Sequence, residues 1–288
     1  MDTHIKKNII ESYQVDAGFI VHDAAMLSTI YKALGIDPKS SLDPRIYELE
    51  GITHFFQRGV EGLFKRMGIT KEDYVLSFGE GAGGPSRLLT KITGAHVLGV
   101  DVNPNQIAKA RELAVLHGLR EKLAYHEHNV EDFSFDKKDF TKAYVNETCG
   151  HWQEKAKAFA RIFDHCVPGA TLGFNAWIRG DKGDLNDAYD PIPDFRDLYK
   201  RWIWFQDDLP TYKQLLTDAG FTVLEMFDCT DRVDIRMRAR LKADRQWQIY
   251  EEALGRSAKE SGIAYYTGML KTHFDYLRYG VIIARKNS

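Results

Sequence analysis

The 288-residue sequence has few cysteines, no excess of charge of either sign and no long apolar run. Its three cysteines, Cys149, Cys166 and Cys229, are too few and too scattered for a disulfide framework or a CxxC metal site. This low cysteine content favours a reducing, cytoplasmic location. With 39 Lys and Arg against 41 Asp and Glu, the net charge of -2 provides no broad attraction for nucleic acid. We therefore expect no metal site and no nucleic-acid partner.

Membrane segments are also not expected. No apolar run approaches the length of about 18 residues that a membrane-spanning helix needs. Residues 1–19 have charges on either side of a very short apolar run, which is not the pattern of a signal peptide. The length suits one α/β domain with additional segments.

A glycine-rich segment at residues 75–84, VLSFGEGAGG, is the most informative feature that is present. It follows an apolar strand, and glycines allow the backbone to turn sharply and to lie against a ligand. A second apolar strand ends in Asp101, about 20 residues after Gly79, where a carboxylate can accept hydrogen bonds from a ribose. The pattern predicts a site for an adenosine-bearing cofactor, and it also fits the dinucleotide fingerprint.

Strand and helix patterns alternate after residue 73, which indicates a parallel sheet covered by helices. The glycine at position 118 and the proline at position 104 are typical of a helix end and start. Expected strands are 74–78, 96–100, 123–128, 142–146, 171–178, 222–228 and 279–285. Expected helices are 52–67, 84–92, 104–117, 152–166 (with Pro168-Gly169 as its stop) and 209–219.

Two segments, 179–208 and 231–275, do not fit this alternation and are rich in aromatic and charged residues. Each follows a strand, at the sheet edge where open α/β sheets bind ligands. We expect a cap over the site, with the longer segment helical and residues 1–51 as a further helical part; a dimerisation surface is the alternative. The expected core is then 52–178, 209–230 and a last strand within 276–288.

From about residue 52 to residue 286 the sequence resembles the class I S-adenosylmethionine-dependent methyltransferases. The glycine segment 75–84, Asp101, the stretch Asn129–Asp132 and the stretch Ala219–Phe221 before a strand match the family's motifs in order. The resemblance implies S-adenosylmethionine as cofactor. It also implies an α/β, Rossmann-like seven-stranded sheet, mostly parallel, with a C-terminal antiparallel hairpin and a mainly helical cap.

The family usually has an acidic residue at the position of Ser77 and a small residue at that of Glu80. Glu80 either supplies the missing charge for the methionine amino group or faces solvent. The resemblance implies that the glycine loop contacts the amino-acid end, that Asp101 binds the ribose, and that Val102, Val130 and Asn129 or Glu131 contact the adenine. The full predicted cofactor set is Ser77, Gly79, Glu80, Gly81, Gly83, Asp101, Val102, Gln106, Asn129, Val130, Glu131 and Asn146.

Residues 144–151 follow the fourth expected strand and resemble the sterol, terpene-diphosphate and cyclopropane-type subgroup, in which a glutamate lies beside the transferred methyl. Glu147 matches this glutamate and is the predicted catalytic residue; capping of the next helix and binding of the cofactor's amino group are the alternatives. His151 is a second catalytic candidate because its pKa lies near neutrality, or else a partly buried residue at a helix start.

Trp177, Tyr265 and Tyr266 are the predicted substrate contacts, since aromatic faces stabilise cations; ordinary core packing is the alternative. The first functional hypothesis is a small-molecule methyltransferase that methylates carbon in an unsaturated, terpenoid or lipid-like substrate. N-methylation of a small amine and a non-methylating protein that binds S-adenosylmethionine on the same fold are the alternatives. A homo-oligomer is possible.

Overall fold

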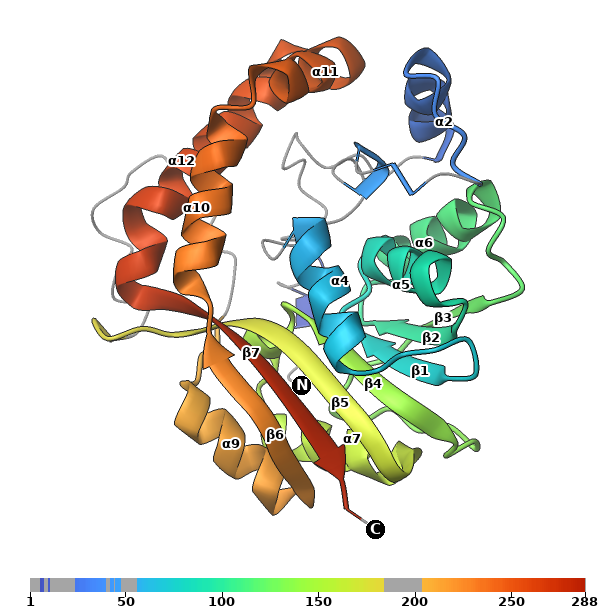
Figure 1. Ribbon diagram of the computed structural model, residues 1–288, viewed down its shortest axis with the longest axis vertical. Coiled ribbons are helices and arrows are strands. Elements are labelled where there is room, and N and C mark those ends of the chain that lie inside the picture. Colours follow the sequence, from blue (N-terminus) through green and yellow to red (C-terminus); the bar gives the residue numbers. More distant parts are fainter. Residues whose placement is uncertain are drawn as a thin grey trace.

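The computed structural model describes residues 24–39, 42–43, 45–47, 56–183 and 204–287, together with residues 6, 7 and 10. Its centre is a seven-stranded sheet with the strand order β3-β2-β1-β4-β5-β7-β6 (Figure 1). The strands are β1 (Tyr74–Phe78), β2 (His96–Asp101), β3 (Leu123–Glu127), β4 (Phe140–Asn146), β5 (Cys166–Arg179), β6 (Phe221–Asp228) and β7 (Leu277–Lys286).

Strands β1 to β5 pair in parallel, whereas β7 runs antiparallel between β5 and β6. This arrangement confirms the expected mostly parallel sheet with an antiparallel C-terminal hairpin. Because β7 runs against both of its neighbours, the end of β6 and the start of β7 lie at the same edge as the carboxyl ends of the parallel strands.

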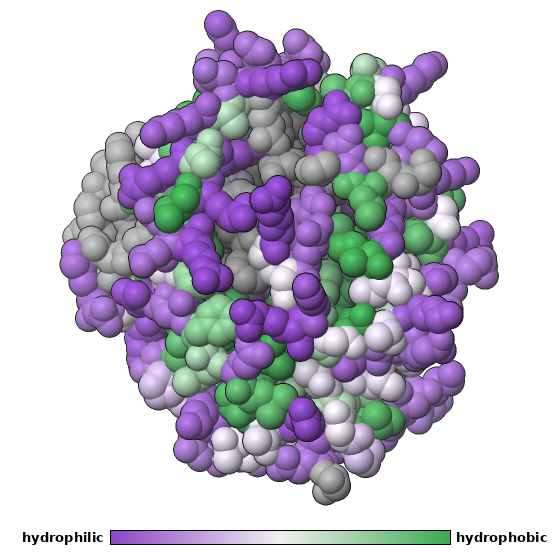
Figure 2. Space-filling model, in the orientation of Figure 1, coloured by the Kyte–Doolittle hydropathy of each residue, from purple (hydrophilic) through white to green (hydrophobic). Residues whose placement is uncertain are grey.

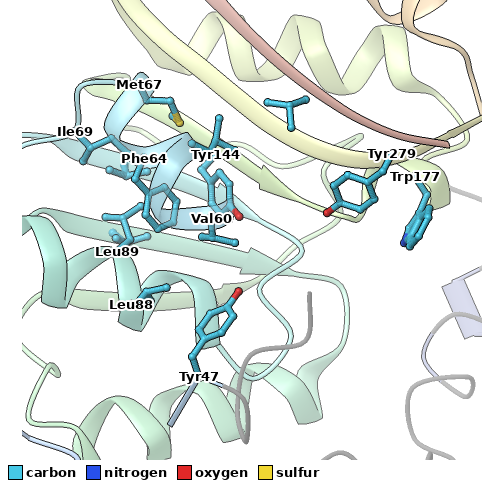
Figure 3. Close-up of a cluster of buried hydrophobic side chains, with 14 of the residues drawn as sticks. Tyr47, Val60, Phe64, Met67, Ile69, Leu88, Leu89, Tyr144, Trp177 and Tyr279 are labelled. Atoms are coloured by element: carbon cyan, nitrogen blue, oxygen red, sulfur yellow. The ribbon is translucent and has the colours of Figure 1, made fainter. Parts of the chain in front are cut away.

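Helices cover both faces of the sheet. On one face, α4 (Phe56–Arg66) and α5 (Gly84–Thr93) bury apolar side chains against β1 and β4, and Phe64 packs edge-on against Tyr144 with ring centroids 5.0 Å apart (Figure 3). On the other face, α7 (Lys155–His165) and α9 (Leu209–Asp218) bury Phe159 and Tyr212. Helix α6 (Pro104–Leu116) connects β2 to β3 on the same face as α5, and α2 (Ala24–Ala33) contacts α6. The result is a three-layer α/β/α core.

Helix boundaries follow the expected signals at α6 but not at α7. The Asn103 side chain caps α6 by accepting the N–H groups of Asn105 and Gln106. Helix α7 was expected over 152–166, with its stop at 168–169, but it spans Lys155–His165. The difference arises because β5 already begins at Cys166, which pairs with Phe140, and because residues 149–151 form a separate 3₁₀-helix, η1 (Cys149–His151).

Three helices between β6 and β7 form an arm that projects from the sheet (Figure 1): α10 (Thr230–Leu241), α11 (Asp244–Leu254) and α12 (Arg256–Tyr276). The arm starts and ends at the edge where the parallel strands end. Its outer surface is largely hydrophilic (Figure 2), while Val233 and Met237 are buried. Residues 184–203, most of the first expected cap segment, lie outside the described residues, as does most of 1–23.

Within the described parts of the chain, no helix combines the length and the apolar character needed to cross a membrane. All three cysteines are free and buried. The same residues contain no group of three or more His, Cys, Asp or Glu side chains that could hold a metal ion.

Candidate functional site

The site lies between β1 and β4, where the order of the strands in the sheet reverses. Strand β1 pairs with β2 on one side and with β4 on the other, so the loops after β1 and β4 leave the same edge at a topological switch point, where open α/β sheets bind ligands. The two loops touch: a Cβ added to Gly79 would lie 2.5 Å from the Cβ of Thr148. The glycine loop and the segment that contains Glu147 therefore form one site.

Three glycines shape the loop after β1. Gly79, Gly81 and Gly83 have φ angles of 72°, 53° and 79°, in the left-handed region that side chains disfavour. The N–H of Gly79 donates to the carbonyl of Val100 at 3.0 Å, and the N–H of Gly83 donates to that of Glu80 at 2.8 Å. The loop is thereby held against the end of β2, with Gly83 as the N-cap residue of α5.

Asp101 at the end of β2 is fixed by backbone donors. Its Oδ2 accepts the Gly81 N–H at 2.8 Å, and its Oδ1 accepts the Asn103 N–H at 2.9 Å. Burial raises the pKa of Asp101 above its ordinary value, although these two hydrogen bonds oppose the rise. Each carboxylate oxygen can accept a second hydrogen bond. The oriented carboxylate can thus still accept two hydroxyl donors, as a ribose diol requires.

Glu80 is only 4% exposed, so the alternative that it faces solvent is wrong. Its side chain packs on β2, because a Cβ added to Gly99 would lie 2.5 Å from the Cγ of Glu80. Burial and, to a smaller extent, the nearby Asp101 carboxylate raise the pKa of Glu80. The structure therefore places a second carboxyl group inside the site, one strand away from Asp101.

Several polar atoms around this loop are buried without a hydrogen-bond partner among the described residues. Native proteins rarely leave such atoms unpaired, because each costs about 1–3 kcal/mol. A bound ligand with amino, carboxyl and hydroxyl groups, such as S-adenosylmethionine, would supply partners, so the residues present fit this cofactor. Among these atoms are Asn103 Nδ2 and Gln106 Oε1.

The predicted adenine contacts follow β2 and β3. Val102 is half-buried, Val130 is buried, and Asn129 accepts the N–H of Glu131 on its side-chain oxygen at 3.1 Å. Glu131 has a structural role in addition, since its Oε1 accepts the N–H groups of residues 153 and 154 at 2.7 and 3.1 Å. It thereby holds the start of α7, while Val102, Val130 and Asn129 or Glu131 stay the predicted adenine contacts.

Glu147 follows β4 directly and has an unusual backbone. Its φ is 51°, and no other non-glycine residue of the described chain has a positive φ. Such strained conformations concentrate at functional sites. Its N–H donates to the carbonyl of Asn175 at 2.9 Å, and its carboxylate accepts a short hydrogen bond from the Tyr279 hydroxyl. The N-cap residue of η1 is Thr148, and no side chain caps this helix. The Glu147 carboxylate therefore does not cap the next helix but binds Tyr279 of β7.

A set of polar side chains, the Glu147 network, connects β4, β5 and β7. Asn175 Nδ2 donates to the oxygen of Tyr279 at 2.8 Å and to Asn146 Oδ1 at 3.0 Å. The Tyr144 hydroxyl lies 3.1 Å from the Oδ1 atoms of both Asn146 and Asn175. Asn146, a predicted cofactor contact, lies in this network. Tyr144, Asn175 and Tyr279 were not predicted, although an asparagine within an apolar strand was a signal that could have been used.

His151 lies in η1 and is 5% exposed. Its ring packs on that of Trp204, with centroids 4.7 Å apart, and the same Trp204 closes over Gly150, where a Cβ would meet it at 2.9 Å. This is the geometry of the buried helix-start alternative. A catalytic role for His151 stays a prediction.

The three predicted substrate contacts are aromatic, and one of them packs against the Glu147 network. Trp177 packs edge-on against Tyr279, with ring centroids 4.9 Å apart (Figure 3). Tyr265 of α12 is buried in the same hydrophobic cluster, and its ring lies 5.6 Å from that of Tyr266. The helical arm therefore supplies aromatic residues to the cluster that contains Tyr279. Substrate contact by these three predicted residues is untested.

Comparisons with known proteins agree with this geometry. Residues 75–169 match the model of a methyltransferase domain. The sterol 24-C-methyltransferase of Saccharomyces cerevisiae is 29% identical over 196 residues, which is 66% of this chain and 50% of that protein. The chain thus spans about half the length of the curated relatives it matches.

Solved structures share the fold. Phosphoethanolamine N-methyltransferase 2 from Haemonchus contortus, solved with S-adenosylhomocysteine, superposes with a TM-score of 0.72 and 18% identity over 85% of this chain and 56% of that one. Geranyl diphosphate C-methyltransferase from Streptomyces coelicolor gives a TM-score of 0.56 and 16% identity over 80% of this chain and 77% of that one. Residues 75–169 are therefore similar to a methyltransferase domain, and the chain shares its fold with S-adenosylmethionine-dependent methyltransferases of known structure. In sequence it is similar to sterol 24-C-methyltransferases.

Proposed function

We propose that this protein transfers a methyl group from S-adenosylmethionine to a carbon atom of an unsaturated, terpenoid or lipid-like small molecule. One observation carries the proposal: the Glu147 carboxylate binds Tyr279, a member of a mainly apolar and aromatic cluster, while the next residue, Thr148, lies against the glycine loop. Such surroundings suit an apolar acceptor that becomes positively charged during the reaction.

The glycine loop and Asp101 would hold the cofactor. The main chain of residues 79–83 and the buried Glu80 carboxyl would contact its amino-acid end, Asp101 would accept the two ribose hydroxyls, and Val102, Asn129 and Val130 would contact the adenine. When bound, the cofactor supplies a methyl group on a positively charged sulfur that leaves readily. The protein therefore needs mainly to align the acceptor and to stabilise charge.

Glu147 would act on the acceptor. Addition of a methyl group to a carbon–carbon double bond leaves a positive charge on the acceptor and ends with the loss of a proton. A fixed carboxylate stabilises that charge and can accept the proton. The faces of Trp177 and Tyr279 can add about 0.5–2 kcal/mol each through cation–π attraction.

The relatives support the carbon acceptor over the amine. Both the sterol 24-C-methyltransferase and the geranyl diphosphate C-methyltransferase carry C-methylation in their names. N-methylation of a small amine, the activity named for the Haemonchus contortus protein, is the second candidate, because the same carboxylate could hold an ammonium group.

The test is release of S-adenosylhomocysteine in the presence of prenyl diphosphates, unsaturated sterols or small amines, with the methylated product identified by mass spectrometry. We expect a product with a new carbon-bound methyl. Glu147→Gln should lower turnover by about 10²–10³-fold, the loss typical of removing one electrostatic contact, with cofactor affinity nearly unchanged. Glu121→Gln, the same change at an exposed residue between α6 and β3, is the matched control and should have no effect.

Two outcomes would overturn the proposal. Methylation of nitrogen alone would favour the amine reaction. If Glu147→Gln keeps its turnover and loses affinity for S-adenosylmethionine, Glu147 is a cofactor ligand and does not act on the acceptor.

A further inference from the structure

We propose that Tyr279 is a positioning residue for Glu147: its hydroxyl holds the carboxylate in place through a donated hydrogen bond. The inference rests on the proposed function in that Glu147 is the carboxylate that faces the acceptor. Tyr279 is fully buried and comes from β7, 132 residues further along the chain.

The direction of the hydrogen bonds supports this role. The amide nitrogen of Asn175 donates to the Tyr279 oxygen at 2.8 Å and to Asn146 Oδ1 at 3.0 Å. An ionised carboxylate can only accept, so the Tyr279 hydroxyl is the donor in its contact with Glu147, and the Asn175 amide nitrogen against the Tyr279 oxygen agrees with this direction. With its oxygen already accepting from Asn175, Tyr279 has its one proton left for Glu147.

Tyr279 also keeps that proton at neutral pH. Burial first, and then the negative charge of Glu147, raise the pKa of Tyr279 well above 10. The ring itself is held by the edge-on contact with Trp177 (Figure 3). The phenol is therefore a fixed, neutral donor.

Asn175 restrains Glu147 at two points. Its backbone carbonyl accepts the Glu147 N–H at 2.9 Å, and its side chain orients Tyr279, which binds the Glu147 carboxylate. The main chain of Glu147 between these two contacts is in a left-handed conformation (φ 51°). The hydrogen bonds thus fix both ends of the residue.

The test compares Tyr279→Phe with Tyr212→Phe. Tyr212 is equally buried on the other face of the sheet, and its hydroxyl has no hydrogen-bond partner among the residues described, so its loss is a matched control. We expect Tyr279→Phe to lower kcat by about 10- to 100-fold, the range for losing one hydrogen bond to a charged group. KM for the acceptor and the affinity for S-adenosylmethionine should change less than about 2-fold, because the hydrogen bond does not contribute to binding of either molecule in the ground state. Tyr212→Phe should leave all three values unchanged.

A double-mutant cycle with Glu147→Gln separates a positioning role from a structural one. If Tyr279 acts through Glu147, adding Tyr279→Phe to Glu147→Gln costs no further turnover. Fully additive losses, or a loss of cofactor affinity equal to the loss of kcat, would overturn the proposal.

A cycle of Tyr279→Phe with Glu147→Ala in urea unfolding needs no activity and so distinguishes this inference from the proposed function; alanine leaves no oxygen that could still accept the Tyr279 hydroxyl, as glutamine would. Non-additive unfolding free energies would show that Tyr279 and Glu147 are coupled even if Glu147→Gln keeps full turnover and the proposed function fails. Additive unfolding free energies would refute the hydrogen bond on which the inference depends.

Discussion

Asp101 provides the sharpest test of the cofactor site. Its carboxylate is oriented by the N–H groups of Gly81 and Asn103, and each oxygen has one acceptor position left. Replacement by alanine removes the acceptor for both ribose hydroxyls. It also frees the Gly81 N–H, so the glycine loop loses one of its attachments to β2.

The expected loss follows from these contacts. Two hydrogen bonds to a charged group contribute about 1.5–3 kcal/mol each, or about 3–6 kcal/mol together. At 1.4 kcal/mol per factor of ten, Asp101→Ala should weaken S-adenosylmethionine binding by about 10²–10⁴-fold. Asp101→Asn keeps the shape but turns an NH₂ group toward one of the two backbone donors, so we expect a clear loss there as well.

Isothermal calorimetry with purified protein measures the affinity, and circular dichroism establishes that each variant is folded. Glu121→Ala, which removes an exposed carboxylate after α6, controls for the change in net charge. Wild-type affinity should fall on acidification at a pH above 3.8, the ordinary pKa of aspartate, because burial raises the pKa of Asp101 and only the ionised form accepts both hydroxyls.

Unchanged affinity in a folded Asp101→Ala protein would refute this account of the site. A preference of the wild-type protein for NADH over S-adenosylmethionine would refute it equally, since the glycine and aspartate pattern also occurs in dinucleotide-binding proteins.

Two further predictions concern the loop. Gly79→Ala and Gly169→Ala both place alanine at a positive φ (72° and 81°), at a cost of about 1–2 kcal/mol, but only at Gly79 does the new Cβ meet Thr148 at 2.5 Å. Gly79→Ala should therefore unfold at clearly lower urea concentration than Gly169→Ala, and equal midpoints would contradict the contact. Because burial raises the pKa of Glu80 above 4.5, its contribution to stability falls as the pH rises through the raised value. The unfolding free energy of cofactor-free Glu80→Gln should then increase relative to wild type from acid toward neutral pH, and a constant difference would show that the Glu80 carboxyl is not desolvated.

Local patterns were sufficient to predict the sheet and the cofactor loop. Strand and helix periodicity and the turn glycines act over a few residues, so the order of elements could be read from them, and the seven-stranded sheet is confirmed. The predicted boundaries of α7 were wrong, because β5 starts where its first residue pairs with Phe140, a residue of another strand. Such pairing has no local signal.

The side chains of the site divide in the same way. The places of Gly79, Gly81 and Asp101 at the ends of β1 and β2 could be predicted from the sequence alone. Glycine favours a backbone turn with positive φ, and the acidic residue directly follows an apolar strand. The burial of Glu80 could not be predicted, because it depends on the absence of a side chain at Gly99 in the neighbouring strand.

The sequence by itself thus determined the class of fold, the place of the glycine loop and the carboxylates that border it. Only the tertiary structure decided what Glu147 contacts. Tyr279, Asn175 and Asn146 reach the Glu147 network from separate strands, and β7 lies beside β5 only because it enters the sheet antiparallel between β5 and β6. A hydrogen bond between residues 132 positions apart depends on strand order and register. These are set by packing of the whole sheet, and no local pattern in the chain encodes them.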